Sequence, residues 1–342
     1  MSLSEIEKKA EKWLNDPFSK ETREKVKELY NNKKLLEDCF YKDLEFGTGG
    51  MRGVMGVGTN RINKYTLGKN TQGICNYLNK TEKGEIKVAI AFDCRNNSKS
   101  FAQIVADVFS ANKIKVYIFN QLRPTPELSF AVKVLNCNCG IVLTASHNPP
   151  EYNGFKICRG KLPMAGEELQ ELKATFDSGE FKEGSGSVTE LPEFQYQVLD
   201  TIVENSGKPQ RPIRLAVDCG NAVPGPLTVE LMSRLGVDLV PIHCEWDNKF
   251  PNHPPDPTRP KNMVELGAAV VENGCEFGIG MDGDGDRIGV VDENGKFVHP
   301  DRLMVLFAAD ILVDRRGGTE SERVVFYDVK CSMALEEAIR ES

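Results

Sequence analysis

The stretch that decides the fold runs from residue 87 to residue 146. It comprises KVAIAF (87–92), SFAQIVADVFSAN (100–112), KVYIF (115–119), ELSFAVKVLN (127–136) and CGIVLTAS (139–146). The short apolar runs are typical of strands buried in a parallel sheet, and Phe101, Val105 and Phe109 recur at helical spacing. Two consecutive strand–helix–strand units predict a helix-covered parallel sheet with right-handed crossovers. Ser146 then falls at the carboxyl end of a strand, where such sheets bind ligands.

The same alternation recurs beyond a segment rich in Gly, Ser and charged residues (178–211). Strands are expected at 213–218, 237–243, 275–282 and 288–292, with helices between the first three. Glu293-Asn294-Gly295 predicts a hairpin. A further unit begins near Asp301, with a helix, a strand at 323–329 and a helix from Ser332.

The organisation expected is therefore α/β, with successive three-layer α/β domains whose mixed, mostly parallel sheets are covered by helices. We predict a helical lead-in over 1–40, a first domain over 41–204, a second over 205–300 and the start of a third over 301–342. In the lead-in, Ser4 and Glu7 have capping-box spacing, and Asn15-Asp16-Pro17 ends the helix.

Composition excludes several classes of protein. A net charge of −7 argues against a nucleic-acid surface, which needs clustered Lys and Arg. Apolar runs fall short of the roughly 20 residues that span a bilayer, and the N-terminus lacks the apolar stretch of a secretory signal. The ten cysteines form no CxxC pair, which favours free thiols over a disulfide framework. We expect a cytoplasmic protein without nucleic-acid or membrane partners.

The segment Asp282-Gly283-Asp284-Gly285-Asp286-Arg287 is a candidate metal site. Three carboxylates alternating with glycine can curl around one hard cation such as magnesium, calcium or manganese. An EF-hand is the rival, since Glu293 occupies the twelfth position. Against it, Arg287 stands where the sixth position requires glycine, and the flanks predict strands. A solvated acidic turn is the remaining alternative.

The segment 144–150, TASHNPP, places Ser146 in a proline-stiffened loop. It is not the GxSxG elbow of a hydrolase, because Thr144 and Asn148 replace the two glycines. Alone, Ser146 would be a turn residue or a helix cap, and His147 a hydrogen-bonded structural histidine. Beside the acidic loop, a phosphate on Ser146 could complete the coordination of a divalent ion.

Two further segments carry candidate cations. Lys156, in Asn153-Gly154-Phe155-Lys156, could neutralise a transferring phosphoryl group or move a proton; otherwise it is a surface lysine. Residues 46–53, FGTGGMRG, match neither GxGxxG nor the P-loop, but Arg52 could approach a phosphate.

Taken in this order, the motifs TASHNP and DGDGDR resemble the α-D-phosphohexomutase superfamily of phosphoglucomutases and phosphomannomutases, over about 41–332. The resemblance implies a phosphorylated Ser146 that holds one Mg²⁺ with Asp282, Asp284 and Asp286. It assigns Arg52, Lys156 and His147 to catalysis, with Lys156 favoured over His147 as the base, and Arg287 and Lys330 to substrate binding.

The activity implied is interconversion of hexose 1-phosphate and 6-phosphate, glucose first and mannose second, through a bisphosphate such as glucose 1,6-bisphosphate. A pentose phosphate is an alternative substrate. Other readings are a non-catalytic fragment that binds metal and phosphosugar, and a phosphatase using the same ion. Sequence does not indicate the oligomeric state.

Two features depart from the family. Its sugar-selecting and C-terminal phosphate-gripping loops follow the last residue here, and residues 317–321 replace neither, so we expect poor turnover by this chain alone. Residues 1–145 resemble phosphopentomutase-related phosphoglucomutases, whereas those from about 155 resemble the bacterial phosphomannomutase/phosphoglucomutase subgroup. We hypothesise a splice near TASHNP; equal similarity of both parts to one subgroup would exclude it.

Overall fold

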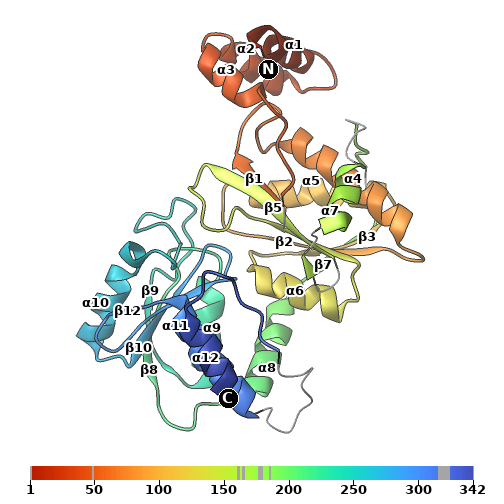
Figure 1. The fold of residues 1–342 in the computed structure, drawn as a ribbon. Helices are drawn as coiled ribbons and strands as arrows, with labels where there is room; N and C mark the ends of the chain where they lie inside the picture. The colour runs from red at the N-terminus through yellow and green to blue at the C-terminus, as the bar shows by residue number, and fades with distance from the viewer. Residues whose placement is uncertain are drawn as a thin grey trace.

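The structure is a computed structural model that describes residues 2–47, 50–159, 162–163, 166–175, 180–184, 186–314 and 324–341. Figure 1 shows a helical N-terminal unit, followed by two sheets that are each flanked by helices. Within the described ranges, no helix combines the length and apolar character needed to cross a bilayer.

Helices form the N-terminal unit, as predicted. They are α1 (Leu3–Glu11), the 3-10 helix η1 (Lys12–Leu14), α2 (Lys20–Leu29) and α3 (Lys33–Phe40), and they enclose a core around Trp13 and Phe40. The predicted cap was wrong by two residues: Ser2, not Ser4, caps α1, and its capping-box partner is Glu5. Both pairs have the same spacing, so the pattern did not distinguish them.

The first sheet has the strand order β1-β5-β4-β2-β3-β7, with β6 beside β5. Strand β5 runs antiparallel to β4 and β1, whereas β2, β3, β4 and β7 pair in parallel, so the sheet is mixed and mostly parallel as predicted. Its strands are β1 (Met51–Val54), β2 (Lys87–Phe92), β3 (Lys115–Phe119), β4 (Cys139–Leu143), β5 (Tyr152–Arg159), β6 (Leu162–Pro163) and β7 (Val188–Leu191).

Helices cover both faces of this sheet and make a three-layer unit (Figure 1). One face packs on α4 (Lys64–Thr81) and α5 (Ser98–Ala111), with α7 (Gly166–Lys173) against α4. The other face packs on α6 (Thr125–Val134) and α8 (Phe194–Ser206). Strand β7 and α8 lie inside the Gly/Ser-rich segment 178–211, so part of that segment is regular because it covers apolar sheet surface.

The second sheet has the order β12-β11-β10-β8-β9, in which β8 pairs in parallel with β9 and β10. Its strands are β8 (Arg214–Asp218), β9 (Asp238–Ile242), β10 (Phe277–Met281), β11 (Ile288–Val291) and β12 (Phe297–Val298). The hairpin predicted at 293–295 joins β11 to β12, with the Gly295 amide donating to the Asp292 carbonyl at 2.9 Å. Two separate cores flank the sheet, one under α9 (Gly225–Leu235) and one under η2 (Pro260–Met263) and α10 (Val264–Asn273).

The last described elements are α11 (Pro300–Asp314) and α12 (Met333–Glu341), which pack against each other. The strand predicted at 323–329 was wrong over the described residues 324–329, which are irregular. Phe326 is 89% and Val329 is 95% exposed. A strand forms only when its backbone groups pair with a neighbour, and no described strand lies beside this segment.

Candidate active site

Ser146 lies in the turn that follows β4, at the carboxyl edge of the first sheet. Its backbone is left-handed (φ 54°), an uncommon conformation for a residue with a side chain. The Ser146 amide donates to Thr144 Oγ1 at 2.8 Å, and the whole residue is buried. The hydroxyl therefore has a fixed position rather than that of a mobile surface serine.

Arg95, which the sequence analysis did not single out, braces this turn. Its buried guanidinium donates from Nη2 to the carbonyl oxygens of Ser146 (2.7 Å) and Asn148 (2.6 Å), and from Nη1 to those of Pro149 (2.7 Å) and Tyr152 (3.2 Å). The ring of Phe250, which belongs to the loop after β9, lies 5.0 Å from the Arg95 guanidinium carbon. Arg95 thus joins the serine turn to the second sheet's loops.

The aspartate loop connects β10 to β11, so strands flank it and the EF-hand alternative is excluded. The Asp282 Oδ1 atom accepts from the amides of Asp286 (2.9 Å) and Arg287 (3.0 Å). The Asp282 carboxylate therefore closes the loop on itself. Asp282 and Asp284 are fully buried, which excludes a solvated acidic turn.

The structure brings Ser146 and the aspartate loop into contact, although 136 residues separate Ser146 from Asp282. The Ser146 hydroxyl donates to Asp282 Oδ2 at 2.8 Å. A Cβ atom on Gly283 would lie 1.9 Å from the Ser146 carbonyl oxygen, so the two backbones can approach this closely only with glycine there.

Lys156 and Thr125 bind the buried Asp284. The Lys156 ammonium lies 2.5 Å from Asp284 Oδ2 and 2.5 Å from Asp286 Oδ2. Thr125, the first residue of α6, donates its hydroxyl to Asp284 Oδ2 at 2.5 Å and its amide to the Asp284 carbonyl at 2.9 Å. Burial would raise the pKa of Asp284, but Lys156 and the Thr125 hydroxyl together lower it.

Arg287 and His147 complete the surroundings of the hydroxyl. Arg287 Nη2 donates to Ser146 Oγ at 2.6 Å and to Asp282 Oδ2 at 2.7 Å, and it contacts His147 Nδ1. His147 Nδ1 is also 3.2 Å from Ser146 Oγ. Burial and the positive charge of Arg287 both lower the pKa of His147, which favours its neutral form.

Burial, followed by the neighbouring charges of Asp284 and Asp286, raises the pKa of Asp282 to about 7. Lys156 and Arg287 offset part of this negative charge, and the raised pKa of Asp282 indicates that repulsion among the three carboxylates remains. One ligand oxygen from each lies within 4.8 Å of the others. The buried Asp284 Oδ1 has no hydrogen-bond partner. Hard oxygen donors, crowded negative charge and an unpartnered oxygen fit a divalent cation such as magnesium.

The remaining predicted site residues lie farther out. Arg52 is on β1, where Nη1 donates to Asn148 Oδ1 at 3.4 Å, so it borders the serine turn without a hydrogen bond to Ser146 or the aspartates. Two residues of its glycine-rich loop, Thr48 and Gly49, lie outside the described residues. The Lys330 side chain is 85% exposed and lies 3.8 Å from Asp328, so the structure does not bring it to the cluster.

Comparison with known proteins gives the family. The model described as phosphoglucomutase/phosphomannomutase, alpha/beta/alpha domain I, matches residues 43–183, and that for domain II matches residues 193–295. The chain belongs to the phosphoglucomutase/phosphomannomutase family. Both the serine turn and the aspartate loop lie within the matched ranges.

Family members from several bacteria are similar to this chain. A phosphomannomutase/phosphoglucomutase of Pseudomonas aeruginosa is 41% identical over 215 residues, which are 62% of this chain and 44% of that protein. A phosphoglucomutase of Neisseria meningitidis is 35% identical over 85% of this chain and 61% of its own length. The solved structure of a Burkholderia thailandensis family protein superposes with a TM-score of 0.77 at 33% identity, covering 86% of this chain and 63% of that one. The chain thus spans about half the length of the curated relatives it matches.

Proposed function

We propose that this chain carries the phosphoryl-transfer site of a phosphohexomutase, with Ser146 as the phosphoryl carrier. The observation that supports this most is the hydrogen bond from Ser146 Oγ to Asp282, which puts the hydroxyl beside three clustered carboxylates. Relatives are named phosphoglucomutase and phosphomannomutase. The substrates proposed are hexose 1-phosphates and 6-phosphates, with glucose before mannose and a pentose phosphate as the alternative.

Asp282, Asp284 and Asp286 would hold one Mg²⁺ together with an oxygen of phosphorylated Ser146. When bound, the ion would offset negative charge on the phosphoryl oxygens during transfer. In the described structure the Lys156 ammonium supplies positive charge to Asp284 and Asp286, and the Arg287 guanidinium supplies it to Asp282. These contacts support a site in which Lys156 and Arg287, together with Mg²⁺, would offset the charge of the aspartates and of a phosphate on Ser146.

In the proposed reaction, the bond from phosphorus to Ser146 Oγ breaks while a bond forms from phosphorus to a sugar hydroxyl oxygen. Arg287 Nη2, which donates to Oγ at 2.6 Å, would stabilise the charge that develops on the departing oxygen. The hydroxyl proton passes to a basic side chain. Lys156 remains our first candidate for this role, which requires its ammonium, paired here with Asp284 and Asp286, to release a proton first. His147, whose neutral form is favoured, is the second candidate. Arg52 at the rim of the serine turn would bind phosphate.

The product of the first transfer is a sugar bisphosphate, for which glucose 1,6-bisphosphate is the proposed example. After it turns round, its other phosphate is transferred back to Ser146 with the reverse bond changes, so the serine is regenerated in its phosphorylated form.

We also propose Lys330 as a substrate contact, and residues 41–204 and 205–300 as the first and second domains. All ten cysteines are free, and this supports a reducing compartment such as the cytoplasm.

Intact mass spectrometry tests this function on the chain as it is. With Mg²⁺ and glucose 1,6-bisphosphate, we expect the mass of one phosphate to be added, and to be lost again when glucose 6-phosphate is supplied in excess. Ser146→Ala should prevent the addition, whereas Ser233→Ala, at an exposed serine of α9, should not. An unmodified Ser146 under these conditions favours a non-catalytic binding protein, and loss of phosphate to water without a sugar acceptor favours a phosphatase.

A further inference from the structure

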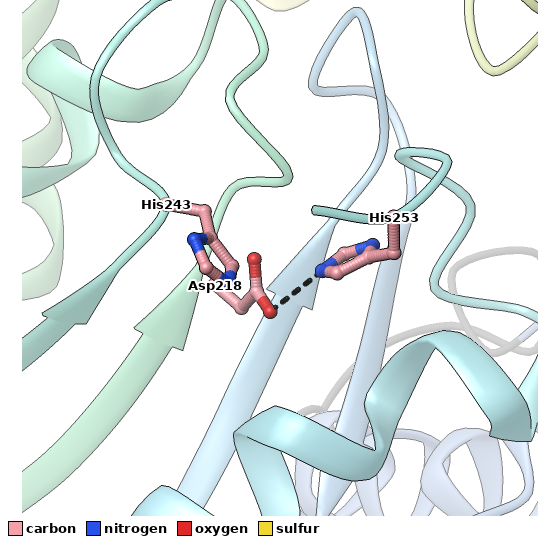
Figure 2. Close-up of side chains that lie close together, drawn as sticks. All are labelled: Asp218, His243 and His253. Atoms are coloured by element: carbon pink, nitrogen blue, oxygen red, sulfur yellow. Dashed lines mark hydrogen bonds and ion pairs between the residues drawn. The ribbon is translucent and has the colours of Figure 1, made fainter. Parts of the chain in front are cut away.

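A second group of metal-ligating side chains lies at the carboxyl edge of the second sheet, outside the aspartate loop. Asp218 ends β8, His243 follows β9, and His253 lies in the proline-rich loop 250–260 (Figure 2). One ligand atom from each of the three lies within 4.8 Å of the others. The chain has four histidines, and two of them meet at this one buried carboxylate.

Asp218 and His253 contact each other, and each is also held by a backbone partner. His253 Nε2 lies 2.9 Å from Asp218 Oδ2, while its Nδ1 lies 3.0 Å from the Pro254 carbonyl oxygen. Asp218 Oδ1 accepts from the Gly220 amide at 2.8 Å, which fixes the carboxylate plane. A histidine that ligates a metal typically donates its other ring N–H to a backbone carbonyl or a carboxylate, and Nδ1 of His253 is placed to do so.

The partner of His243 is a carboxylate, that of Glu265. His243 Nε2 lies 2.7 Å from Glu265 Oε2 at the start of α10, and its Nδ1 lies 2.8 Å from Asn252 Nδ2. Nδ1 is therefore the atom that would bind the ion, and the Asn252 amide would move away from it when the ion binds. The His243 backbone is left-handed, with φ 47°. The β9 turn thus directs this ring toward Asp218 and His253, with the ring centroids of the two histidines 5.6 Å apart (Figure 2).

We propose that Asp218, His243 and His253 form a binding site for a divalent transition-metal cation of the zinc type. Two imidazoles and one carboxylate suit zinc and its neighbours, whereas Mg²⁺ and Ca²⁺ prefer oxygen alone. The His243 and His253 side chains are 18% and 15% exposed, so an ion can reach them from solvent. Three protein ligands leave a further coordination position for water.

This site has no ligand in common with the aspartate site, but the proline-rich loop that carries His253 contacts the aspartate loop. Two residues beyond His253, the Pro255 carbonyl accepts from the amide of Gly283 in the aspartate loop at 3.0 Å. An ion on Asp218, His243 and His253 would fix the loop that supports Gly283. The proposal depends on the donor geometry alone, so it holds whether or not the mutase function is correct.

The proposal is tested by titrating the whole chain with Zn²⁺ in a calorimeter. A large excess of Mg²⁺ is present throughout, so that the aspartate site is occupied by Mg²⁺. We expect one equivalent of Zn²⁺ to bind. His243→Gln and His253→Gln should each weaken it by on the order of 100-fold, and Glu265→Gln, at an exposed orienting residue, by about 10–100-fold. His299→Gln, at a histidine outside the cluster, is the matched control and should leave the affinity unchanged.

X-ray absorption at the zinc edge identifies the ligands directly. We expect nitrogen and oxygen neighbours with an imidazole pattern and Zn–N distances of about 2.0–2.1 Å. Absence of stoichiometric binding, an affinity unchanged from the parent chain in both histidine variants, or a sulfur shell from the nearby Cys219 and Cys244 would each overturn the proposal. The variants should keep the far-UV spectrum of the parent chain. If the histidine variants unfold, Glu265→Gln decides the outcome, because its side chain is 58% exposed.

Discussion

At the scale of single residues, Arg95 explains how a buried serine is kept in an unfavourable backbone conformation. A left-handed non-glycine residue costs about 1–3 kcal/mol and persists only where its surroundings hold it in place. The four carbonyl oxygens that accept from Arg95 begin at Ser146 itself and continue to Tyr152. Because the guanidinium is planar and forked, it can hold several carbonyls in one arrangement, which the single ammonium of a lysine cannot do.

We therefore predict that Arg95→Lys slows phosphorylation of Ser146 by about 100-fold, the usual effect of a misplacement near 1 Å. Binding of glucose 1,6-bisphosphate should change by less than about threefold, since Arg95 holds the turn and not the sugar. Rates are measured by mass spectrometry below the unfolding temperature of the variant, and the affinity by calorimetry. Arg234→Lys is the matched control, because Arg234 pairs with Glu230 on the surface of α9. An equal loss of rate and affinity would contradict a positioning role.

The sequence predicted Ser146 and the three aspartates because each motif is local, with spacing that restricts its chemistry. It did not predict Arg95 or Thr125. The carbonyl partners of Arg95 lie 51–57 residues away and could belong to any residue type, and Thr125 meets Asp284 across 159 residues. Contacts to backbone atoms leave no pattern in the side chains that make them. For Arg95, the sequence offers one indication, its position among the polar residues that directly follow β2.

At the scale of elements, the βαβ units were predictable because each buried strand is a short apolar run. The regular elements within 178–211, β7 and α8, were not predicted, and the strand predicted at 323–329 is absent from the described residues 324–329. Contacts with neighbouring elements decide both cases, and the local sequence does not show them. The sequence does not show which way the Lys156 side chain points. In the structure Lys156 lies on β5, which pairs with β4 in the register Val142↔Lys156. That register points its side chain to the aspartate loop, which sequence alone could not establish.

Contact between two elements, the serine turn and the aspartate loop, depends on Gly283. We predict that Gly283→Ala lowers the rate of Ser146 phosphorylation more than tenfold and destabilises the chain by about 1–3 kcal/mol, because the added Cβ separates the two backbones. Gly274→Ala, at the left-handed C-cap of α10 with open space around it, should lose about 1 kcal/mol through backbone strain alone. It should phosphorylate normally. A normal rate in Gly283→Ala would show that the close approach is not required.

Glu127 on α6 forms a buried ion pair with Arg123, which precedes the helix, and this pair should make stability depend on pH. Glu127 is 1% exposed, neither of its carboxylate oxygens has a hydrogen-bond partner, and Arg123 Nε is 3.5 Å away. Burial raises the pKa of Glu127 from 4.5 to about 7, against the opposing effect of Arg123. The folded state therefore binds this proton more tightly than the unfolded state does.

It follows that this group's contribution is complete below about pH 4.5 and is lost as the pH rises to about 7. We predict that Glu127→Gln becomes more stable relative to the parent chain over this interval, by on the order of 3 kcal/mol in total, and that the difference is constant above it. Urea unfolding at a series of pH values measures the difference. A difference independent of pH would show that Glu127 is ionised throughout.

At the scale of the whole molecule, the candidate active site is also the place where the two sheets are joined. Ser146, Thr125 and Lys156 come from the first sheet and its helices, and all three bind aspartates carried by the second. Helix α8 adds a second connection by contacting both α6 and α9. The splice near TASHNP, between a part that resembles one subgroup and a part that resembles another, stays a hypothesis. Separate alignments of residues 1–145 and 155–342 test it.

A cation held jointly by the aspartates and phosphorylated Ser146 would couple the two sheets, so its removal should affect them together. We predict that Mg²⁺ at about 100 times its Kd stabilises the phosphorylated chain by about 2.7 kcal/mol. Calorimetry should show Tm rising for the unfolding of both sheets in one transition, and EDTA should reverse the rise. In Asp284→Asn the Mg²⁺-dependent shift should disappear while His299→Gln retains it. If Mg²⁺ instead separated the transition into two, or raised Tm equally in Asp284→Asn, the ion would be acting elsewhere, because only an ion bridging Ser146 and the aspartates requires both sheets to be folded before it can bind.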